Sequence, residues 1–183
     1  MGYPELARIL RRAGVTHEKT NQEDASELFR RMVFNILMDN TDDHEKNHSL
    51  LVLSPFENGR FKLAPAYDVL PTHSGQGYQE FICGSQGRDS TLENALSECN
   101  AFGLLTEEAT TEVRRVINVV ETWKTHFAQL GVTQLDIDNF AAVMSRIAPK
   151  LQLQLGNDTS PPVSIIFSEM EDFHPDTLFH KLE

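Results

Sequence analysis

The stretch from residue 21 to residue 40 constrains the fold of this chain most strongly. It opens with polar residues that favour a helix start and then repeats large apolar side chains every three to four positions. These apolar positions are Leu28, Phe29, Met32, Val33, Ile36 and Leu37. A stripe this wide predicts a helix that is buried on most of its surface, so the rest of the chain has to pack around it.

A β-hairpin is expected directly after this helix. Two short runs with strand-like composition, at 50–53 and 61–63, flank a segment that contains Asn58-Gly59. Asn-Gly between two apolar runs is a strong local signal for a tight turn joining antiparallel strands. We therefore predict a hairpin between about residues 49 and 64.

Helical periodicity returns in the second half of the chain. A capping-box pattern at 90–93 predicts a short helix, and Thr106 is expected to cap a long helix that stops at Gly131. Another helix is expected from near Thr133 until Pro149 breaks it. The predicted fold class is therefore mainly α with a small β-hairpin.

The remaining predictions of local structure concern the start of the chain and the segment after the hairpin. The apolar spacing of Leu6, Ile9 and Leu10 predicts a short helix near the start, followed by a polar linker. Residues 71–89 are rich in Gly, Ser and Gln and lack periodicity. We expect them to form a long surface loop.

Composition indicates one main globular domain. The chain has 183 residues, 40% of them hydrophobic and 23% charged. We expect a domain over residues 1–156 and an acidic, proline-containing tail over 157–183. No apolar run is long enough to span a membrane and no secretory signal is recognisable, so we expect a cytoplasmic protein without membrane contact. Cys83 and Cys99 are expected to be reduced thiols.

The formal net charge of −11 comes from 27 acidic and 16 basic residues. Binding to a phosphate backbone requires clustered Lys and Arg, so direct nucleic-acid binding is not expected. A nucleotide is compatible with this charge, because magnesium held by carboxylates can bridge protein and phosphate.

The residues with the clearest chemical meaning lie at 41–49, between the buried helix and the first expected strand. Kinases place a base carboxylate on a loop after a buried helix and, five residues later, an Asn that binds magnesium; Asp42 and Asn47 have this spacing. The hairpin should then return Asp68 to the side of Asn47. In this interpretation Asp42 directs a Ser or Thr hydroxyl, while Asn47 and Asp68 hold the Mg²⁺ that bridges the ATP phosphates. Lys46 would reach the transferring phosphate.

Two motifs carry a family resemblance. Asp42-Asp43-His44-Glu45-Lys46-Asn47-His48-Ser49, followed by Leu63-Ala64-Pro65-Ala66-Tyr67-Asp68-Val69-Leu70-Pro71, resembles the paired signature of HipA-like toxin kinases. The resemblance covers residues 28 to 72. It implies that Asp42 is the catalytic base, that Asn47 binds magnesium and that Asp68 replaces the Asp of the Asp-Phe-Gly motif of other kinases.

The resemblance also implies a fold and partners. The fold would be the C-terminal, helical lobe of a protein-kinase-like fold, and the protein would be a Ser/Thr kinase acting as the toxin of a bacterial toxin–antitoxin pair. No Gly-rich phosphate loop and no strand-borne Lys precede Asp42. We therefore expect the N-lobe to lie outside this sequence, either in a longer form of the same protein or on a separate chain. We also expect a protein substrate and an antitoxin as partners, and no activity from this chain alone.

Two other functions stay open. The chain could be a non-catalytic module that docks an antitoxin or a partner N-lobe. It could also be a small-molecule phosphotransferase of the aminoglycoside type, although Tyr67-Asp68 in place of Asp-x-Asp argues against this. His44 is expected to pack and hold the loop rather than bind metal. Tyr67 is expected either to position Asp68 or to fill the space between hairpin and helix as part of the scaffold.

Overall fold

The computed structural model describes residues 1–52, 60–72 and 76–144. The predicted Asn58-Gly59 turn, Pro149 and the tail at 157–183 lie outside these ranges. So does the expected domain boundary at residue 156.

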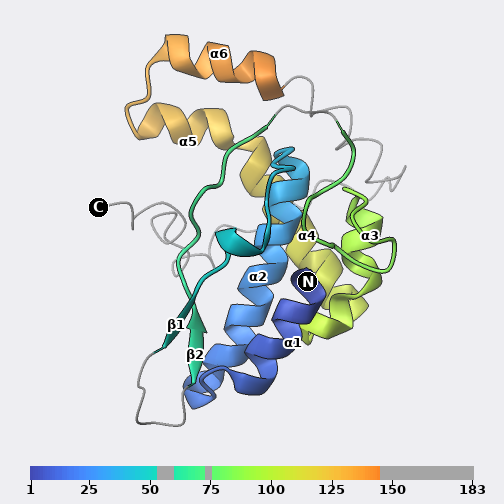
Figure 1. Cartoon of the computed structure of the whole chain (residues 1–183). Helices are drawn as coiled ribbons and strands as arrows, with labels where there is room; N and C mark the ends of the chain where they lie inside the picture. Colours follow the sequence, from blue (N-terminus) through green and yellow to red (C-terminus); the bar gives the residue numbers. More distant parts are fainter. Residues whose placement is uncertain (53–59, 73–75, 145–183) are drawn as a thin grey trace.

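The described part of the chain is mainly helical and carries one antiparallel hairpin, as predicted (Figure 1). Its helices are α1 (Tyr3–Ala13), α2 (Thr20–Leu37), α3 (Leu92–Ser97), α4 (Thr106–Glu121), α5 (Trp123–Gln129) and α6 (Gln134–Met144), its strands are β1 (Leu50–Val52) and β2 (Phe61–Leu63), and its 3-10 turns are η1 (His17–Lys19), η2 (Glu45–Asn47) and η3 (Cys99–Phe102). None of the described helices has the length and apolar character required to cross a membrane.

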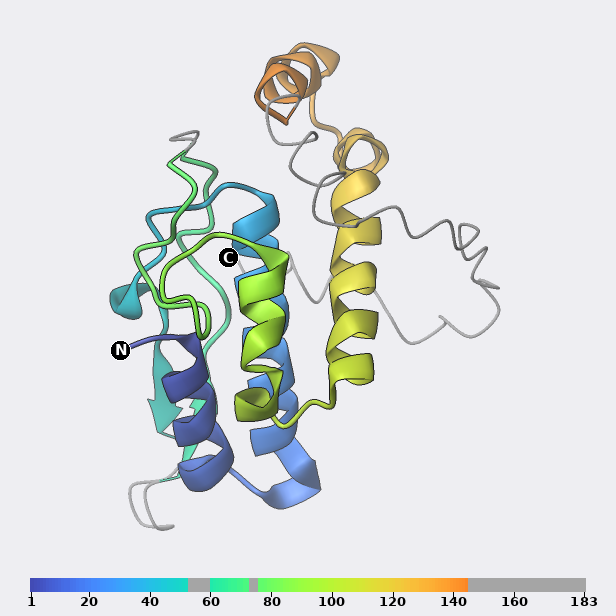
Figure 2. The same cartoon turned by 90° about the vertical axis from the view of Figure 1, so that its right-hand side faces the viewer.

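Helix α2 is the centre of the core. Helices α1, α3 and α4 lie around it, and the hairpin lies beside α1 and α2 (Figures 1 and 2). The predicted apolar stripe of α2 is buried along its whole length. Phe29 of this stripe meets Phe102 of η3 edge to face, with ring centroids 5.2 Å apart.

The hairpin is anchored to α2 by a side chain. Leu50 lies opposite Leu63 in the register of the two strands. The backbone N–H of Leu63 donates to Oδ2 of Asp24, an α2 residue, at 2.8 Å. Burial raises the pKa of Asp24, so this carboxylate is held against the strand at an electrostatic cost. The anchor fixes where β2 ends and therefore where residues 64–72 begin.

The long helix expected from Thr106 to near Gly131 is two helices. Thr122 interrupts it with φ −91° and ψ 3°, and the chain restarts as α5 at Trp123. The N-cap is Leu105 rather than Thr106; Glu108 accepts the Leu105 backbone N–H at 2.7 Å. Periodicity alone did not reveal the break, because the apolar spacing continues across it.

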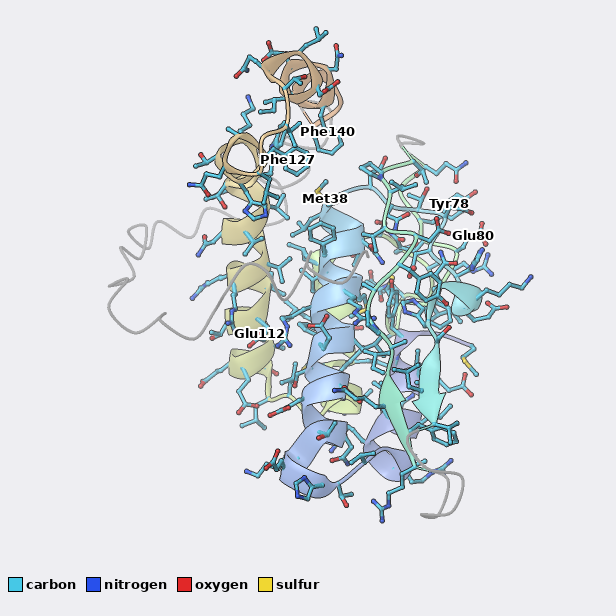
Figure 3. The ribbon with its side chains drawn as sticks, turned by 90° about the vertical axis from the view of Figure 1, so that its left-hand side faces the viewer. Met38, Tyr78, Glu80, Glu112, Phe127 and Phe140 are labelled. Carbon is cyan, nitrogen blue, oxygen red and sulfur yellow. The ribbon has the colours of Figure 1, made fainter. Side chains whose placement is uncertain are left out.

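Helices α5 and α6 pack on each other through aromatic rings. Trp123 meets Phe127 and Phe140 edge to face, at 5.3 and 5.0 Å between centroids. Phe127 and Phe140 face each other between the two helices (Figure 3). Trp123 and Phe127 of α5 therefore both pack against Phe140 of α6.

The segment expected to be a surface loop contributes to the core. From residue 78 to residue 83 its side chains alternate between exposed and buried, with Gln79, Phe81 and Cys83 inside. Tyr78 and Glu80 lie on the outer side (Figure 3). The segment also holds the chain start, since the backbone N–H of Tyr3 donates to the Ile82 carbonyl at 2.9 Å. The surface-loop prediction is wrong for these residues, because an extended chain can bury alternate side chains without a strand partner along its length.

Candidate active site

The loop that carries the predicted residues starts at a sharp helix end. Asp39 adopts a left-handed conformation with φ 53°. The backbone N–H of Asn40 then donates to the Asn35 carbonyl at 2.9 Å, and that of Asp39 to the Ile36 carbonyl at 3.4 Å. This pair of bonds is a Schellman motif, which turns the chain out of α2 at a defined angle.

The start of the loop is tied to the segment that follows Asp68. The Thr72 hydroxyl donates to the Asp39 carbonyl at 2.8 Å and accepts the Thr41 backbone N–H at 3.3 Å. The Thr41 carbonyl in turn accepts the Glu80 backbone N–H at 3.0 Å. Residues 39–41, 72 and 80 are thereby held together, so the segment after Asp68 ends beside the loop.

The adjacent residues Asp42 and Asp43 differ in their burial. Asp42 is exposed, whereas Asp43 is buried. Oδ2 of Asp43 accepts a hydrogen bond from the Tyr3 hydroxyl and lies 2.9 Å from Nε2 of His48. A carboxylate only accepts hydrogen bonds, so His48 carries its hydrogen on Nε2 in this pair.

A buried polar network extends from Asp43 into the helices. The Asn35 amide nitrogen donates to the Tyr3 hydroxyl at 2.9 Å, and the Asn40 amide nitrogen donates to Asn35 Oδ1 at 3.1 Å. Burial, followed by the adjacent Asp43 carboxylate, raises the pKa of Tyr3 well above its usual value. The hydroxyl therefore stays protonated and acts as the donor to Asp43.

Aromatic packing encloses this network. The His48 ring stacks on Phe81 at 5.3 Å between centroids, and Tyr3 meets Phe81 edge to face at 4.9 Å. His48 thus packs and hydrogen-bonds within the loop, and the packing expected for the partly buried His44 stays a prediction. Nδ1 of His44 is buried without a hydrogen-bond partner in the described ranges. Sequence reasoning missed Asp43 and His48; the signal for them was an acidic residue and a histidine five positions apart in the same loop.

The far end of the loop meets the residues that precede Asp68. Asn47 ends the short turn η2 and is buried, with its backbone N–H donating to the His44 carbonyl at 3.0 Å. The Tyr67 hydroxyl donates to the Lys46 carbonyl at 2.6 Å. The hairpin thus brings the neighbour of Asp68 onto the neighbour of Asn47, although 21 residues separate Asp68 from Asn47. Tyr67 is 37% exposed, so the expectation that it fills a buried space is wrong.

Asp68 itself has an unusual backbone conformation. Its φ is 55°, in the left-handed region that residues other than Gly, Asn and Asp rarely adopt. Asp68 and Lys46 are both exposed. Strained residues that the surrounding structure holds in place are common at functional sites.

The donor atoms at this site fit a magnesium ion by their chemistry. Asn47 and Asp68 offer amide and carboxylate oxygens, which are the hard ligands Mg²⁺ prefers. Among the described residues, none hydrogen-bonds to the side-chain amide of Asn47, and no three His, Cys, Asp or Glu side chains converge to hold a metal. A cation here would depend on two protein oxygens completed by water or phosphate, as is usual for magnesium bound with a nucleotide.

Comparison with known proteins gives a family for most of these elements. A family model described as Type VI secretion system, VipA, VC_A0107 or Hcp2 matches residues 118–183, which is less than half of the chain. No curated protein matches the sequence. The family model of the HipA-like C-terminal domain matches residues 1–124, which include α1 to α4, the hairpin and the whole loop described above. This match spans more than half of the chain, and the chain therefore belongs to the family of HipA-like C-terminal domains.

Proposed function

We propose that this chain is the catalytic, helical lobe of a Ser/Thr protein kinase that transfers the γ-phosphoryl group of ATP to a protein hydroxyl. The observation that carries the proposal is the hydrogen bond from Tyr67 to the Lys46 carbonyl. It joins the segment bearing Asp68 to the loop bearing Asp42 and Asn47. Phosphoryl transfer needs positioning and charge neutralisation more than covalent chemistry, so a base and metal ligands on adjoining segments suit it.

Each of the four predicted residues has a role in this proposal. Asp42 is exposed and without an ion pair among the described residues, so its carboxylate is available to orient the hydroxyl of a substrate and to accept its proton. The exposed ammonium of Lys46 would contact the transferring phosphate. Asn47 and Asp68 would hold Mg²⁺, which when bound neutralises charge on the ATP phosphates.

The proposal extends to the cellular setting. The sequence resemblance supports a toxin of a bacterial toxin–antitoxin pair, with an antitoxin as partner and an N-lobe carried on the same or on a separate chain. The N-lobe would supply the groups that cover the ATP phosphates, because the described residues include only a two-stranded sheet. Cys83 and Cys99 are unpaired in the structure, which suits the reducing environment proposed for this protein, the cytoplasm.

Transfer of labelled γ-phosphate from ATP to the protein itself and to a Ser/Thr peptide library tests the proposal. We expect no transfer from this chain alone, transfer when it is joined to its N-lobe, and a loss of at least 10²-fold in Asp42→Ala and Asp68→Ala of the joined protein.

Glu45→Ala is the matched control, because Glu45 is an exposed acid in the same loop with no assigned role. Full activity of both Asp variants would exclude the site. ATP binding without any transfer would favour the non-catalytic module, and transfer to an aminoglycoside alone would favour the small-molecule enzyme.

A further inference from the structure

We propose that Asp43, which has no role in the chemistry above, is the positioning residue of the site. Its carboxylate holds both ends of the loop at once, so that Asp42 faces outward and Asn47 stays beside the segment of Asp68. This inference rests on the proposed function for its catalytic consequence, but the anchoring itself can be measured without activity.

The geometry places Asp43 between the two proposed functional residues of the loop. Asp43 follows Asp42 directly, and its partner His48 follows Asn47 directly. The bond of 2.9 Å between Asp43 Oδ2 and His48 Nε2 closes the loop across these positions. Their side chains are 4% and 3% exposed, so water competes little for the bond. A change at Asp43 therefore acts on both functional residues through the backbone.

The same oxygen also fixes the loop to the rest of the domain. Oδ2 of Asp43 accepts the Tyr3 hydroxyl from the start of α1, a residue 40 positions earlier in the sequence. All donors in the network are directed toward this oxygen, from Asn35 through Tyr3 on one side and from His48 on the other. Removing the carboxylate leaves two buried donors without an acceptor. Among the described members of the network, no other side chain accepts hydrogen bonds from two donors on a single atom.

The expected catalytic consequence is a loss in turnover rather than in ATP affinity. Asp43 is buried, and the hydrogen bonds described for its carboxylate are with Tyr3 and His48, so its removal displaces the reacting groups without removing one of them. A displacement of about 1 Å in a catalytic group lowers the rate roughly 10²-fold. We expect kcat to fall by about this factor in Asp43→Ala and the KM for ATP to change less than about threefold.

Asp43→Asn is the conservative variant. The amide oxygen of Asn can occupy the position of Oδ2 and accept both donors, but without the negative charge that strengthens these bonds. We therefore expect Asp43→Asn to retain most of the activity that Asp43→Ala loses. This variant also keeps the test decisive if Asp43→Ala does not fold.

Amide hydrogen exchange on the whole 183-residue chain measures the anchor directly. The Asn47 N–H is bonded to the His44 carbonyl within the loop and serves as the reporter. Its exchange should accelerate at least about 10-fold in Asp43→Ala, less in Asp43→Asn, and remain unchanged in Asn94→Ala. Asn94 is the matched control, because it is buried and its amide donates to the Gly87 and Asp89 carbonyls, away from this loop. Unchanged exchange at Asn47 in Asp43→Ala would overturn the anchoring.

A double-mutant cycle on the joined protein tests the catalytic consequence. Because part of the Asp43→Ala effect acts through Asp42, adding Asp43→Ala to Asp42→Ala should lower kcat by a clearly smaller factor than it does in the wild type; the remaining factor reports the displacement of Asn47. A loss of the same factor in both backgrounds would show that Asp43 does not position Asp42 and would overturn the proposal. Unchanged transfer in Asp42→Ala alone would instead overturn the proposed function, and the exchange result would show whether the anchor exists independently.

Discussion

The Tyr67 hydroxyl donates to the backbone carbonyl of Lys46 at 2.6 Å and lies 2.7 Å from the hydroxyl of Ser49. One partly exposed side chain thereby fastens the end of the hairpin to the loop of Asp42 and Asn47. Ser49 is also the residue whose carbonyl accepts the Ala64 backbone N–H at 2.9 Å, so the contact extends the hairpin beyond β1 and β2. The position of Asp68 follows from this continuation of the hairpin.

Tyr67→Phe should lower the free energy of unfolding by about 0.5–1.5 kcal/mol, the usual net contribution of a hydrogen bond. It should lower phosphoryl transfer by a larger factor than this stability loss explains, because Asp68 is the next residue. Urea unfolding and a transfer assay measure the two effects. Tyr78→Phe is the matched control, since Tyr78 is 39% exposed against 37% for Tyr67 and no hydrogen bond is described for its hydroxyl. Equal effects of the two substitutions would contradict the fastening role.

Local patterns in the sequence were sufficient for most of the secondary structure. The stripe of α2 identified the core helix, and the two strand-like runs identified β1 and β2. Both signals depend on neighbours within a few residues. The break at Thr122 and the burial of Phe81 depend on packing against elements far away in the sequence, which periodicity does not record.

The candidate site could also be predicted only in part from local sequence patterns. Asp42, Asn47 and Asp68 stay predictions, with Asp68 brought toward the loop by the predicted hairpin and by Tyr67. The buried role of Asp43 was not predictable, because its partner Tyr3 is 40 residues away and joins it only after α1 packs on α2. The sequence contained two adjacent acids and no indication of which one faces inward.

Stability at alkaline pH should depend on Cys83. Burial raises the pKa of this thiol to about 12, from an ordinary value of 9.0. Between about pH 9 and pH 10 the unfolded chain loses this proton while the folded chain keeps it. The free energy of unfolding should therefore fall as the pH rises, by up to about 1.4 kcal/mol per pH unit. Urea unfolding of wild type and Cys83→Ala at pH 8, 9 and 10 measures the slope. If both proteins show the same slope, the thiol is not the source.

Two substitutions of Asp24 should have different effects on the stability of the folded chain. Asp24→Ala removes the acceptor of the Leu63 N–H and should destabilise the chain by about 1–3 kcal/mol, because a buried donor is left unpaired. Asp24→Asn keeps an acceptor oxygen and removes the negative charge whose burial raises the pKa of Asp24, so it should be neutral or stabilising at pH 7. Since the raised pKa makes the folded chain favour the protonated acid, any gain from Asn should disappear below about pH 3.8, where the acid is protonated in both states. Urea unfolding at pH 7 and pH 3 measures these differences, and a large loss of stability in Asp24→Asn at pH 7 would refute this account.

Substitutions of Asp68 should affect phosphoryl transfer more than the stability of the folded chain. Its left-handed backbone, at φ 55°, costs a residue with a Cβ about 1–2 kcal/mol, less for Asp than for most others. Asp68→Gly removes this cost, but Gly has more conformational freedom in the unfolded chain and loses more of it on folding, at a similar cost. The free energy of unfolding should therefore change by less than about 1 kcal/mol. Asp68→Asn, which tolerates the same conformation, should be equally stable.

Both variants lack the carboxylate that would bind magnesium, and phosphoryl transfer by the joined protein should fall at least about 10²-fold. Asp68→Val is the control for the backbone, because a β-branched residue is poorly accommodated at positive φ and should destabilise the chain more than either Gly or Asn. Urea unfolding and labelled-phosphate transfer together distinguish the two roles. If stability and activity fall in parallel in the Gly, Asn and Val variants, Asp68 shapes the turn. If the Gly and Asn variants are stable but inactive, its carboxylate serves the reaction.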